Sequence, residues 1–310
     1  HVGKQLRAVT TYTDSQGSVE AATSAATSAI VNVNDAPAGS TRILAALDEN
    51  YFERRSNTYF LDSQSAPDIA SLKDGGWVII WQSYGQDGSL DGIFGQRYRS
   101  NGTVFGAEFQ INSYFNSQQS DPSITGLADG GWLVTWTSSG QDGFQQGVFG
   151  QRYSSNGIKV GFEFQVNTSS FDSQDSSSVI ALDNGGWVVV WVSRPVIGTG
   201  QDGWGAGIFG QKYSSSGSKI GNEFRVNSST DRDQINPSIV KLADGGWIVV
   251  WDNIYFKSSS IVSGQRFGSD GTPIGSEFEI SSAPYGSFPV STALQDGGWL
   301  ITWSGNWING

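Results

Sequence analysis

The stretch DGGWLVTWTSSGQDGFQQGVFGQRYSSNG, residues 129–157, is repeated along this chain of 310 residues. Close copies begin at Asp74, Asn184 and Asp244, and a shortened copy begins at Asp296. The first tryptophans of successive copies lie 52 to 60 residues apart. A period of this length indicates an architecture of repeated supersecondary units, which has to be identified before any single motif is interpreted.

Each complete copy predicts four strands separated by turns. For the copy quoted above they are SITGL (123–127), WLVTW (132–136), VFGQRY (148–153) and EFQVN (163–167), with turn residues at every boundary. The second strand is apolar on both faces: in WVVVW (187–191), the tryptophans and the central valine point one way and the other valines point the opposite way. Both faces of such a strand must be covered. Small sheets packed face to face around an axis satisfy this requirement, so the sequence predicts an all-β protein of the β-propeller class.

The two ends of the chain predict how the ring is completed. The shortened last copy supplies two strands, 290–294 and 299–303. Before the first copy, residues 42–48 match a third strand and residues 51–64 match a fourth strand with its turn. Two strands from each end would complete a blade and remove exposed sheet edges. We therefore predict five four-stranded blades closed by the N- and C-terminal strands; the other interpretation is a longer array that continues beyond Gly310.

The first 36 residues contain no copy of the repeat. They alternate apolar and polar positions and lead into a proline-containing linker at 35–39, which predicts two or three strands, too few to fold well alone. We interpret residues 1–36 as the C-terminal part of an Ig-like β-sandwich and residues 37–310 as the propeller.

Two groups of motifs carry a resemblance to known proteins. VGKQLRAVTTYTDSQGSVEAATSAATSAIVNVNDAP (2–37) resembles the last strands of Ig-like or cadherin-like repeats in giant secreted bacterial RTX-type adhesins. The units DGGWxVxW…GQDG…GIFGQRYSSNG…GxEFQVN are similar to repeats in such adhesins and in related exoproteins. The resemblance covers nearly the whole chain and implies secretion, a calcium-rich extracellular setting, and a role in surface attachment or extracellular structure. The glycine-rich nonapeptides of RTX calcium rolls are absent from the sequence.

The composition excludes several classes of function. The net charge of −11 makes nucleic acids and anionic membrane surfaces unexpected partners. Cysteine is absent and the one histidine is His1, which excludes thiolate chemistry, disulfides and an internal Ser-His-Asp triad. No apolar run approaches the roughly 18 residues that suggest a membrane span, so we expect no membrane insertion. Methionine is absent as well, and we expect the chain to be part of a longer protein.

Aromatic residues in the loops are the candidate ligand-binding residues. Ten of the twelve tryptophans lie in the five Trp-x-x-x-Trp cores and are expected to be buried. The loops after the second strands share one face with the loops that follow the fourth strands, and aromatic rings flanked by Asn, Gln and Asp on such a face suit a sugar ligand. The candidates are Tyr84, Phe144, Trp204, Tyr255, Phe256 and Trp307. Packing of these rings on neighbouring loops is the alternative.

The motif GQDG, which occurs three times, suggests calcium as the one candidate cofactor. Asp87 and Asp91 could share a calcium ion with backbone carbonyls, because calcium takes six to eight oxygen ligands. Asp142 and Asp202 occupy the equivalent position in the next two units. The alternative is an aspartate that accepts a hydrogen bond within its own turn.

Some polar residues recur in every complete unit, which indicates a structural role. A glutamate precedes phenylalanine in each predicted fourth strand: Glu108, Glu163, Glu223 and Glu277. A catalytic acid would occur once or twice rather than in every unit, so we expect these glutamates to hold the fold.

These features favour a non-enzymatic, lectin-like module of a secreted or cell-surface adhesin that binds a glycan or a matrix polymer. One alternative is an assembly module that contacts other copies of itself. The second alternative is a carboxylate-dependent polysaccharide-degrading enzyme, which requires two carboxylates about 5–9 Å apart. The unrepeated Asp231 and Asp233 lie on the predicted loop face. We expect no enzymatic activity, chiefly because internal His and Cys are absent.

Overall fold

The computed structural model describes residues 9–13, 19–23, 55–196, 200–255, 259–281, 286–294 and 297–305. The chain divides into two compact units, residues 1–55 with 307–310 and residues 56–306. In the first unit, β1 (Val9–Thr13) and β2 (Val19–Thr23) form an antiparallel hairpin. The rest of the predicted Ig-like segment lies outside the described residues, and one hairpin gives no support for a sandwich. Among the described residues, no helix is long and apolar enough to cross a membrane.

The second unit consists of antiparallel sheets, each built from consecutive strands. The first sheet holds β3 (Gln64–Ser71), β4 (Trp77–Tyr84), β5 (Asp91–Tyr98) and β6 (Val104–Gln110). The second holds β7 (Gln119–Gly126), β8 (Trp132–Ser139), β9 (Gln146–Tyr153) and β10 (Lys159–Gln165). The third holds β11 (Ser173–Ala181), β12 (Trp187–Arg194), β13 (Gly207–Tyr213) and β14 (Lys219–Arg225). The fourth holds β15 (Asp233–Lys241), β16 (Trp247–Tyr255), β17 (Ser259–Phe267) and β18 (Pro273–Glu279). The last described sheet holds β19 (Gly286–Ala293) and β20 (Trp299–Gly305).

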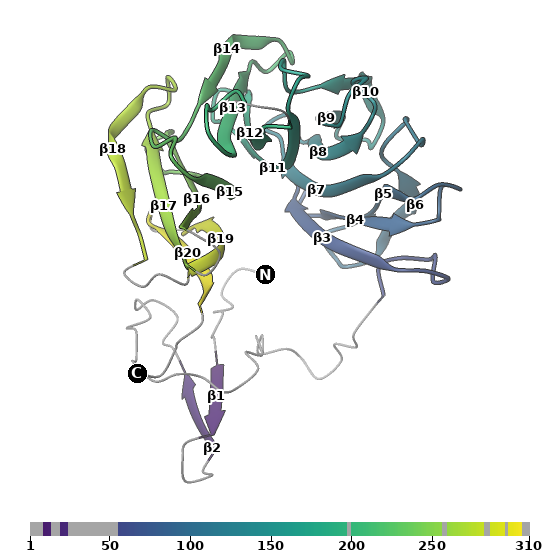
Figure 1. Ribbon diagram of the computed structural model, residues 1–310. Helices are drawn as coiled ribbons and strands as arrows, with labels where there is room; N and C mark the ends of the chain where they lie inside the picture. The colour runs from purple at the N-terminus through teal and green to yellow at the C-terminus, as the bar shows by residue number, and fades with distance from the viewer. Residues whose placement is uncertain are drawn as a thin grey trace. The chain divides into compact units, whose positions relative to one another are not determined.

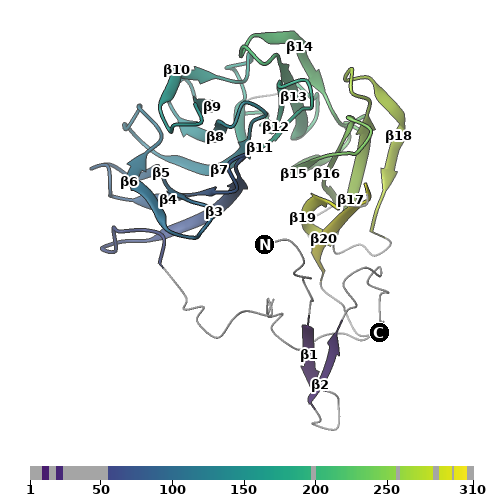
Figure 2. The same ribbon diagram turned by 180° about the vertical axis from the view of Figure 1, so that it is seen from behind.

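The sheets stand side by side in the order of the chain. Figures 1 and 2 show the first strand of each sheet on the inside and β6, β10, β14 and β18 on the outside. Contacts between first strands run from β3 to β7, then to β11, β15 and β19. This is the radial arrangement of a β-propeller, and the predicted order of four strands in each complete unit is confirmed. The last sheet has two strands among the described residues.

The core lies between neighbouring sheets, as the doubly apolar second strands require. Trp132 of β8 stacks on Tyr153 of β9, with 5.2 Å between ring centroids. Phe109 of the preceding sheet packs against the same tyrosine at 5.7 Å. Equivalent contacts recur in the next sheets. In the two-stranded last sheet, Trp299 and Trp303 are 40% and 42% exposed, so the prediction that all ten core tryptophans are buried is wrong there.

A buried asparagine fixes the loop that leaves each of the first three sheets, and Ser281 accepts the equivalent bond from the N–H of Val262 in the fourth. Asn167 Oδ1 accepts the N–H of Val148 at 2.8 Å, and its Nδ2 donates to Gln174 Oε1 at 2.7 Å on the next inner strand. Asn112 and Asn227 make the same bonds in their own sheets. Each asparagine therefore joins the third strand of one sheet to the first strand of the next.

The repeated glutamates join neighbouring sheets, which confirms their structural role. Glu223 of β14 accepts hydrogen bonds from the backbone N–H and the hydroxyl of Thr168, which leaves the preceding sheet, at 2.8 and 2.7 Å. Glu163 contacts Ser113 and Glu277 contacts Ser228 in the same way. The outer strand of each of these sheets thus forms hydrogen bonds with the loop that leaves the sheet before it.

Candidate functional site

The loops between second and third strands and those after the fourth strands lie at one end of the sheets, because the strands alternate in direction. We call this end the loop face. Its described loops are 85–90, 111–118, 140–145, 166–172, 200–206 and 226–232.

The predicted aromatic residues lie on the loop face in separate blades. Tyr84, Phe144 and Trp204 belong to the first, second and third sheets and are 45%, 44% and 76% exposed. The structure therefore spreads these rings over three blades and does not gather them into one pocket. The side chains of Tyr255, Phe256 and Trp307 lie outside the described part of the structure. Three further exposed rings, Phe60, Phe115 and Phe171, precede the inner strands; the sequence marks them by their place three or four residues after a turn asparagine.

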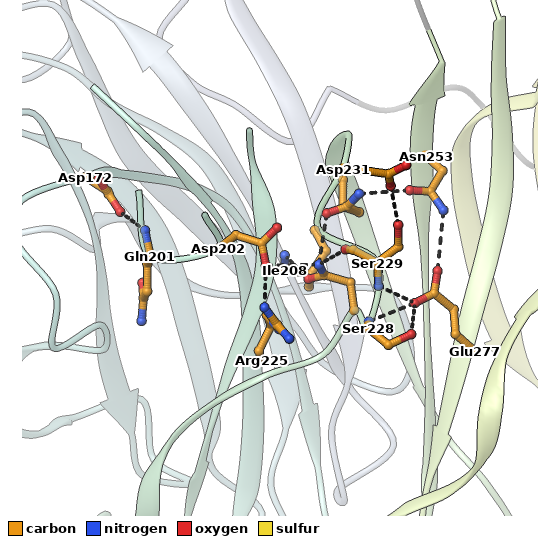
Figure 3. A network of polar contacts seen from close by, with 12 residues as sticks. Asp172, Gln201, Asp202, Ile208, Arg225, Ser228, Ser229, Asp231, Asn253 and Glu277 are labelled. Atoms are coloured by element: carbon orange, nitrogen blue, oxygen red, sulfur yellow. Dashed lines mark hydrogen bonds and ion pairs between the residues drawn. The ribbon is translucent and has the colours of Figure 1, made fainter. Parts of the chain in front are cut away.

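Two of the predicted calcium ligands, Asp87 and Asp142, accept hydrogen bonds within their own turns. Asp87 Oδ1 accepts the N–H of Ser89 at 3.1 Å, and Asp142 Oδ1 accepts the N–H of Phe144 at 3.2 Å, the pattern of an Asx turn. Asp202 Oδ1 accepts a bond of 3.1 Å from Asn227 and faces Arg225 at 3.4 Å, as Figure 3 shows for the arginine.

These aspartates do not form a common ligand set. Asp87 and Asp91 belong to the first sheet, and Asp142 and Asp202 to the second and third. Calcium needs six to eight oxygens around one point. In the described part of the chain, no group of three or more His, Cys, Asp or Glu residues could hold a metal ion. The residues do not fit the predicted site, and calcium binding stays a prediction.

Each inner strand contains a bulge close to the loop face. The strand pairing shifts register there, and one non-glycine residue adopts a positive φ of 48° to 56° in each case: Ala66, Asp121, Ser176, Asn236 and Phe288. The preceding sheet supports the bulge, since Gln82 accepts the N–H of Asp121 at 3.1 Å and Thr137 accepts that of Ser176 at 3.2 Å. Bulges re-aim side chains, and here the residue at the bulge differs in every sheet.

Asp121 and Asp175 form an electrostatically coupled pair on neighbouring inner strands β7 and β11. Burial raises the pKa of Asp121 above its ordinary value, and the charge of Asp175 raises it further, against a hydrogen bond of 3.0 Å from Ser120 Oγ that lowers it. Asp175 is buried and paired with Arg194 through two contacts, 2.6 Å from Nε and 3.3 Å from the terminal nitrogen. Ser176 Oγ donates a further bond of 2.8 Å to Asp175.

A third carboxylate, that of Asp91, interacts electrostatically with Asp121. Burial raises the pKa of Asp91, and the charges of Asp121 and Asp87 also raise it, whereas a bond of 3.0 Å from Gln118 lowers it. The surroundings of the two carboxyl groups therefore differ: desolvation and a like charge act on Asp121, whereas a cation is paired with Asp175. Perturbed carboxyls of this kind mark candidate functional sites.

Sequence reasoning missed this pair. The sequence analysis considered neither Asp121 nor Asp175. The available signal for Asp121 was that an acid stands where other units carry Ala66, Ser176 or Asn236; Asp175 stands one position earlier in its unit, where the second unit carries Ser120. Asp231 and Asp233, the pair considered from the sequence, have structural partners: Asp231 accepts from Ser229 at 2.5 Å, and Asp233 accepts the N–H of Ala206 at 2.8 Å.

No protein-family model matches the sequence, and no curated protein matches it. Solved structures match the fold. An alpha-L-arabinanase of Penicillium chrysogenum, solved with arabinobiose, is 12% identical, with a TM-score of 0.58 over 79% of this chain and 76% of that one. The Hadza microbial sialidase Hz136 is 11% identical, with a TM-score of 0.55 over 77% of this chain and 52% of that one. An alpha-L-arabinofuranosidase of Fusarium graminearum, also solved with arabinobiose, is 13% identical, with a TM-score of 0.53 over 76% and 74%.

These comparisons correct two predictions. The expected main function, a lectin-like adhesin module, and the expected lack of enzymatic activity are both contradicted, because the matching propellers are glycosidases. At 11–13% identity the comparisons establish the β-propeller fold, and the resemblance to RTX-type adhesins stays a prediction. The physical reason for the error is that His and Cys are dispensable for glycoside hydrolysis, which two carboxyl groups can perform.

Proposed function

We propose that the chain is a glycoside hydrolase in which Asp121 and Asp175 are the catalytic carboxyl groups. The observation that carries this proposal is their unequal environment on adjacent inner strands. Asp121 stands at an exposed bulge, where desolvation and the charge of Asp175 raise its pKa, whereas Asp175 is buried and paired with Arg194. Glycoside hydrolases use one carboxylic acid and one carboxylate in this way.

In the proposed reaction, Asp121 donates its proton to the glycosidic oxygen as the bond to the anomeric carbon breaks. Asp175 either removes a proton from the attacking water or attacks the anomeric carbon itself, after which water releases the sugar. In both routes one water is consumed and one glycosidic bond is cleaved. Arg194 is a positioning residue that holds the Asp175 carboxylate through its two contacts.

We propose a polysaccharide as the substrate, because exposed rings lie on three successive blades of the loop face. Tyr84, Phe144 and Trp204 could stack on separate sugar units of an extended chain, while the polar loop residues bind hydroxyl groups. The arabinobiose in two matching structures makes arabinan the first substrate to test. Such a substrate accords with the secreted or cell-surface location that the sequence resemblance implies.

The test is release of reducing sugar from arabinan, xylan and a sialylated glycan by the purified chain and its variants. Asp121→Asn and Asp175→Asn are each expected to lower the rate by about 10²- to 10⁴-fold. Asp270→Asn, which changes a turn carboxylate bonded to Thr272, is the matched control and should keep full activity. Failure of the folded wild-type chain to cleave any of the three substrates, or full activity in both Asp variants, would overturn the proposal.

We also propose that the ring closes as five blades through the N-terminal segment. In each described complete sheet the joining glutamate stands four residues before the residue that begins the exit turn, as in Glu108 and Asn112. Glu53 and Asn57 keep this spacing. Glu108 accepts a hydrogen bond of 2.9 Å from the hydroxyl of Thr58, as expected if residues 57 and 58 form the turn that leaves a preceding blade. Deleting residues 1–50 should then lower the midpoint of thermal unfolding, whereas deleting 1–36 should not. Equal midpoints would contradict closure.

A further inference from the structure

The fourth sheet departs from the repeat at positions that lie together in the strand pairing. The serine near the end of the second strand becomes Asn253, the phenylalanine of the third strand becomes Ser263, and a glycine two residues earlier becomes Ile261. The pairings establish the equivalence, since Trp251 pairs with Ser263 as Trp81 pairs with Phe94. The GQDG motif is absent from this unit as well.

The glycine change shows why the loop of the fourth sheet cannot fold as the others do. A Cβ on Gly92 would lie 2.4 Å from Asp87 Oδ2 and 3.2 Å from the ring of Phe94. In the first three sheets, the GQDG aspartate therefore closes over this glycine. Ile261 places a branched side chain at the equivalent point, so an aspartate loop of that shape is sterically excluded from the fourth sheet.

The loss of the phenylalanine ring leaves a pocket. Phe94, Phe149 and Phe209 are buried at this position, and the fourth sheet has a serine hydroxyl in their place. A pocket of about 280 Å³ lies here, and seven of its eight lining residues are polar. They include Ser228, Ser229, Arg232, Asn253, Ser263 and Glu277. This volume is close to the lower limit for small-molecule sites, about 300 Å³, and the lining requires a polar ligand.

Glu277 supplies the most distinctive group of the pocket. In the first three sheets, a GQDG glutamine donates to Oε1 of the equivalent glutamate. The fourth sheet has no such glutamine, and Glu277 Oε1 instead accepts a long bond of 3.5 Å from Asn253 Nδ2. Oε2 keeps its structural bonds to the N–H and hydroxyl of Ser228, at 2.8 and 2.7 Å. Figure 3 shows Ser228, Ser229 and Asn253 converging on this carboxylate.

We propose that this pocket binds a single sugar unit, separately from the carboxylate pair. Sugar hydroxyls would donate to Glu277 Oε1 in place of the missing glutamine and would accept from the neighbouring side chains. Each hydroxyl can donate and accept, which suits a lining that mixes a carboxylate, hydroxyls, an amide and the guanidinium of Arg232. The pocket lies between the loop that leaves the third sheet and strands β16, β17 and β18 of the fourth, whereas Asp121 and Asp175 stand on the inner strands β7 and β11. It is therefore an accessory site.

The test is binding of a panel of monosaccharides, namely arabinose, xylose, galactose, glucose and N-acetylglucosamine, by saturation-transfer NMR and calorimetry. The triple variant Asn253→Ser, Ile261→Gly, Ser263→Phe restores the residues of the first three sheets and should fill the pocket. We expect it to remain folded and to lose binding. Glu277→Gln should weaken binding by about tenfold or more, since a hydrogen bond to a charged group contributes about 1.5–3 kcal/mol. Glu223→Gln, the matched change in the third sheet, should leave affinity unaltered.

Two results would overturn the accessory site: no monosaccharide of the panel binds to the folded wild-type chain, or the filled triple variant binds as well as the wild type. Asp121→Asn and Asp175→Asn should retain the binding. A failed hydrolysis assay therefore leaves this proposal standing, and a failed binding assay leaves the proposed hydrolase standing.

Discussion

Asn167 offers a direct test of how the sheets are joined, through the substitution Asn167→Ala. Its Oδ1 accepts the N–H of Val148 at 2.8 Å, and its Nδ2 donates at 2.7 Å to both Gln174 Oε1 and the carbonyl of Ser169. Asn167 and Gln174 are buried. Alanine removes all three bonds and leaves the Val148 N–H and the Gln174 Oε1 without these partners.

The expected loss of stability follows from those two groups. A buried polar group without a partner costs about 1–3 kcal/mol. The Ser169 carbonyl is only half-buried and can bind water instead. We therefore expect the free energy of unfolding to fall by about 4 kcal/mol, twice the middle of that range. Asn167→Asp keeps an acceptor for Val148 but loses the donor to Gln174, so we expect a smaller loss.

Urea unfolding followed by tryptophan fluorescence measures this change. The control is Asn101→Ala, because Asn101 is exposed and bonds only within its own turn, to Thr103. Surface changes of this kind usually alter stability by no more than about 0.5 kcal/mol. A loss below about 1 kcal/mol for Asn167→Ala, or equal losses for the two alanine variants, would refute the reasoning.

Three further changes test the packing and the titration of the propeller. Gly150→Ala should lower the free energy of unfolding by about 1–3 kcal/mol, because its Cβ would lie 2.9 Å from the ring of Phe164; urea unfolding with no loss would contradict this close approach. Arg97→Lys should cost about 1 kcal/mol, because lysine lacks the planar guanidinium that lies 5.3 Å from the Trp132 ring, and an unchanged urea midpoint would refute this. Burial raises the pKa of Asp252, so the native state holds this proton more tightly than the unfolded state, and stability falls as pH rises through the interval between the two pKa values. Asp252→Asn should reduce that fall as pH rises above about 4, and an unaltered pH profile of the thermal midpoint would show that Asp252 makes no such contribution.

The sequence was sufficient to predict the architecture wherever the repeat constrained it. Two apolar faces on one strand require neighbours on both sides, and the recurrence of Glu163 and its equivalents correctly indicated a structural role. The inner-strand bulges could not be predicted in the same way. A positive φ is normally marked by glycine, but here Asp121 and Ser176 adopt it with support from the preceding sheet. Without knowledge of the bulges, nothing in the repeat pattern singles out Asp121 as a candidate functional residue.

The bond between each glutamate and the preceding exit turn has a consequence for how such a protein can evolve. Each unit carries both partners of this contact. Its glutamate accepts hydrogen bonds from the unit before it, and the turn after its fourth strand donates hydrogen bonds to the unit after it, as Thr168 does to Glu223. A tandem duplication of about one repeat length would therefore bring both partners of the contact with it, and no new interface residues would have to arise. Because stability in such arrays depends mainly on nearest neighbours, the number of units could change by duplication or deletion while the individual blade stays the same.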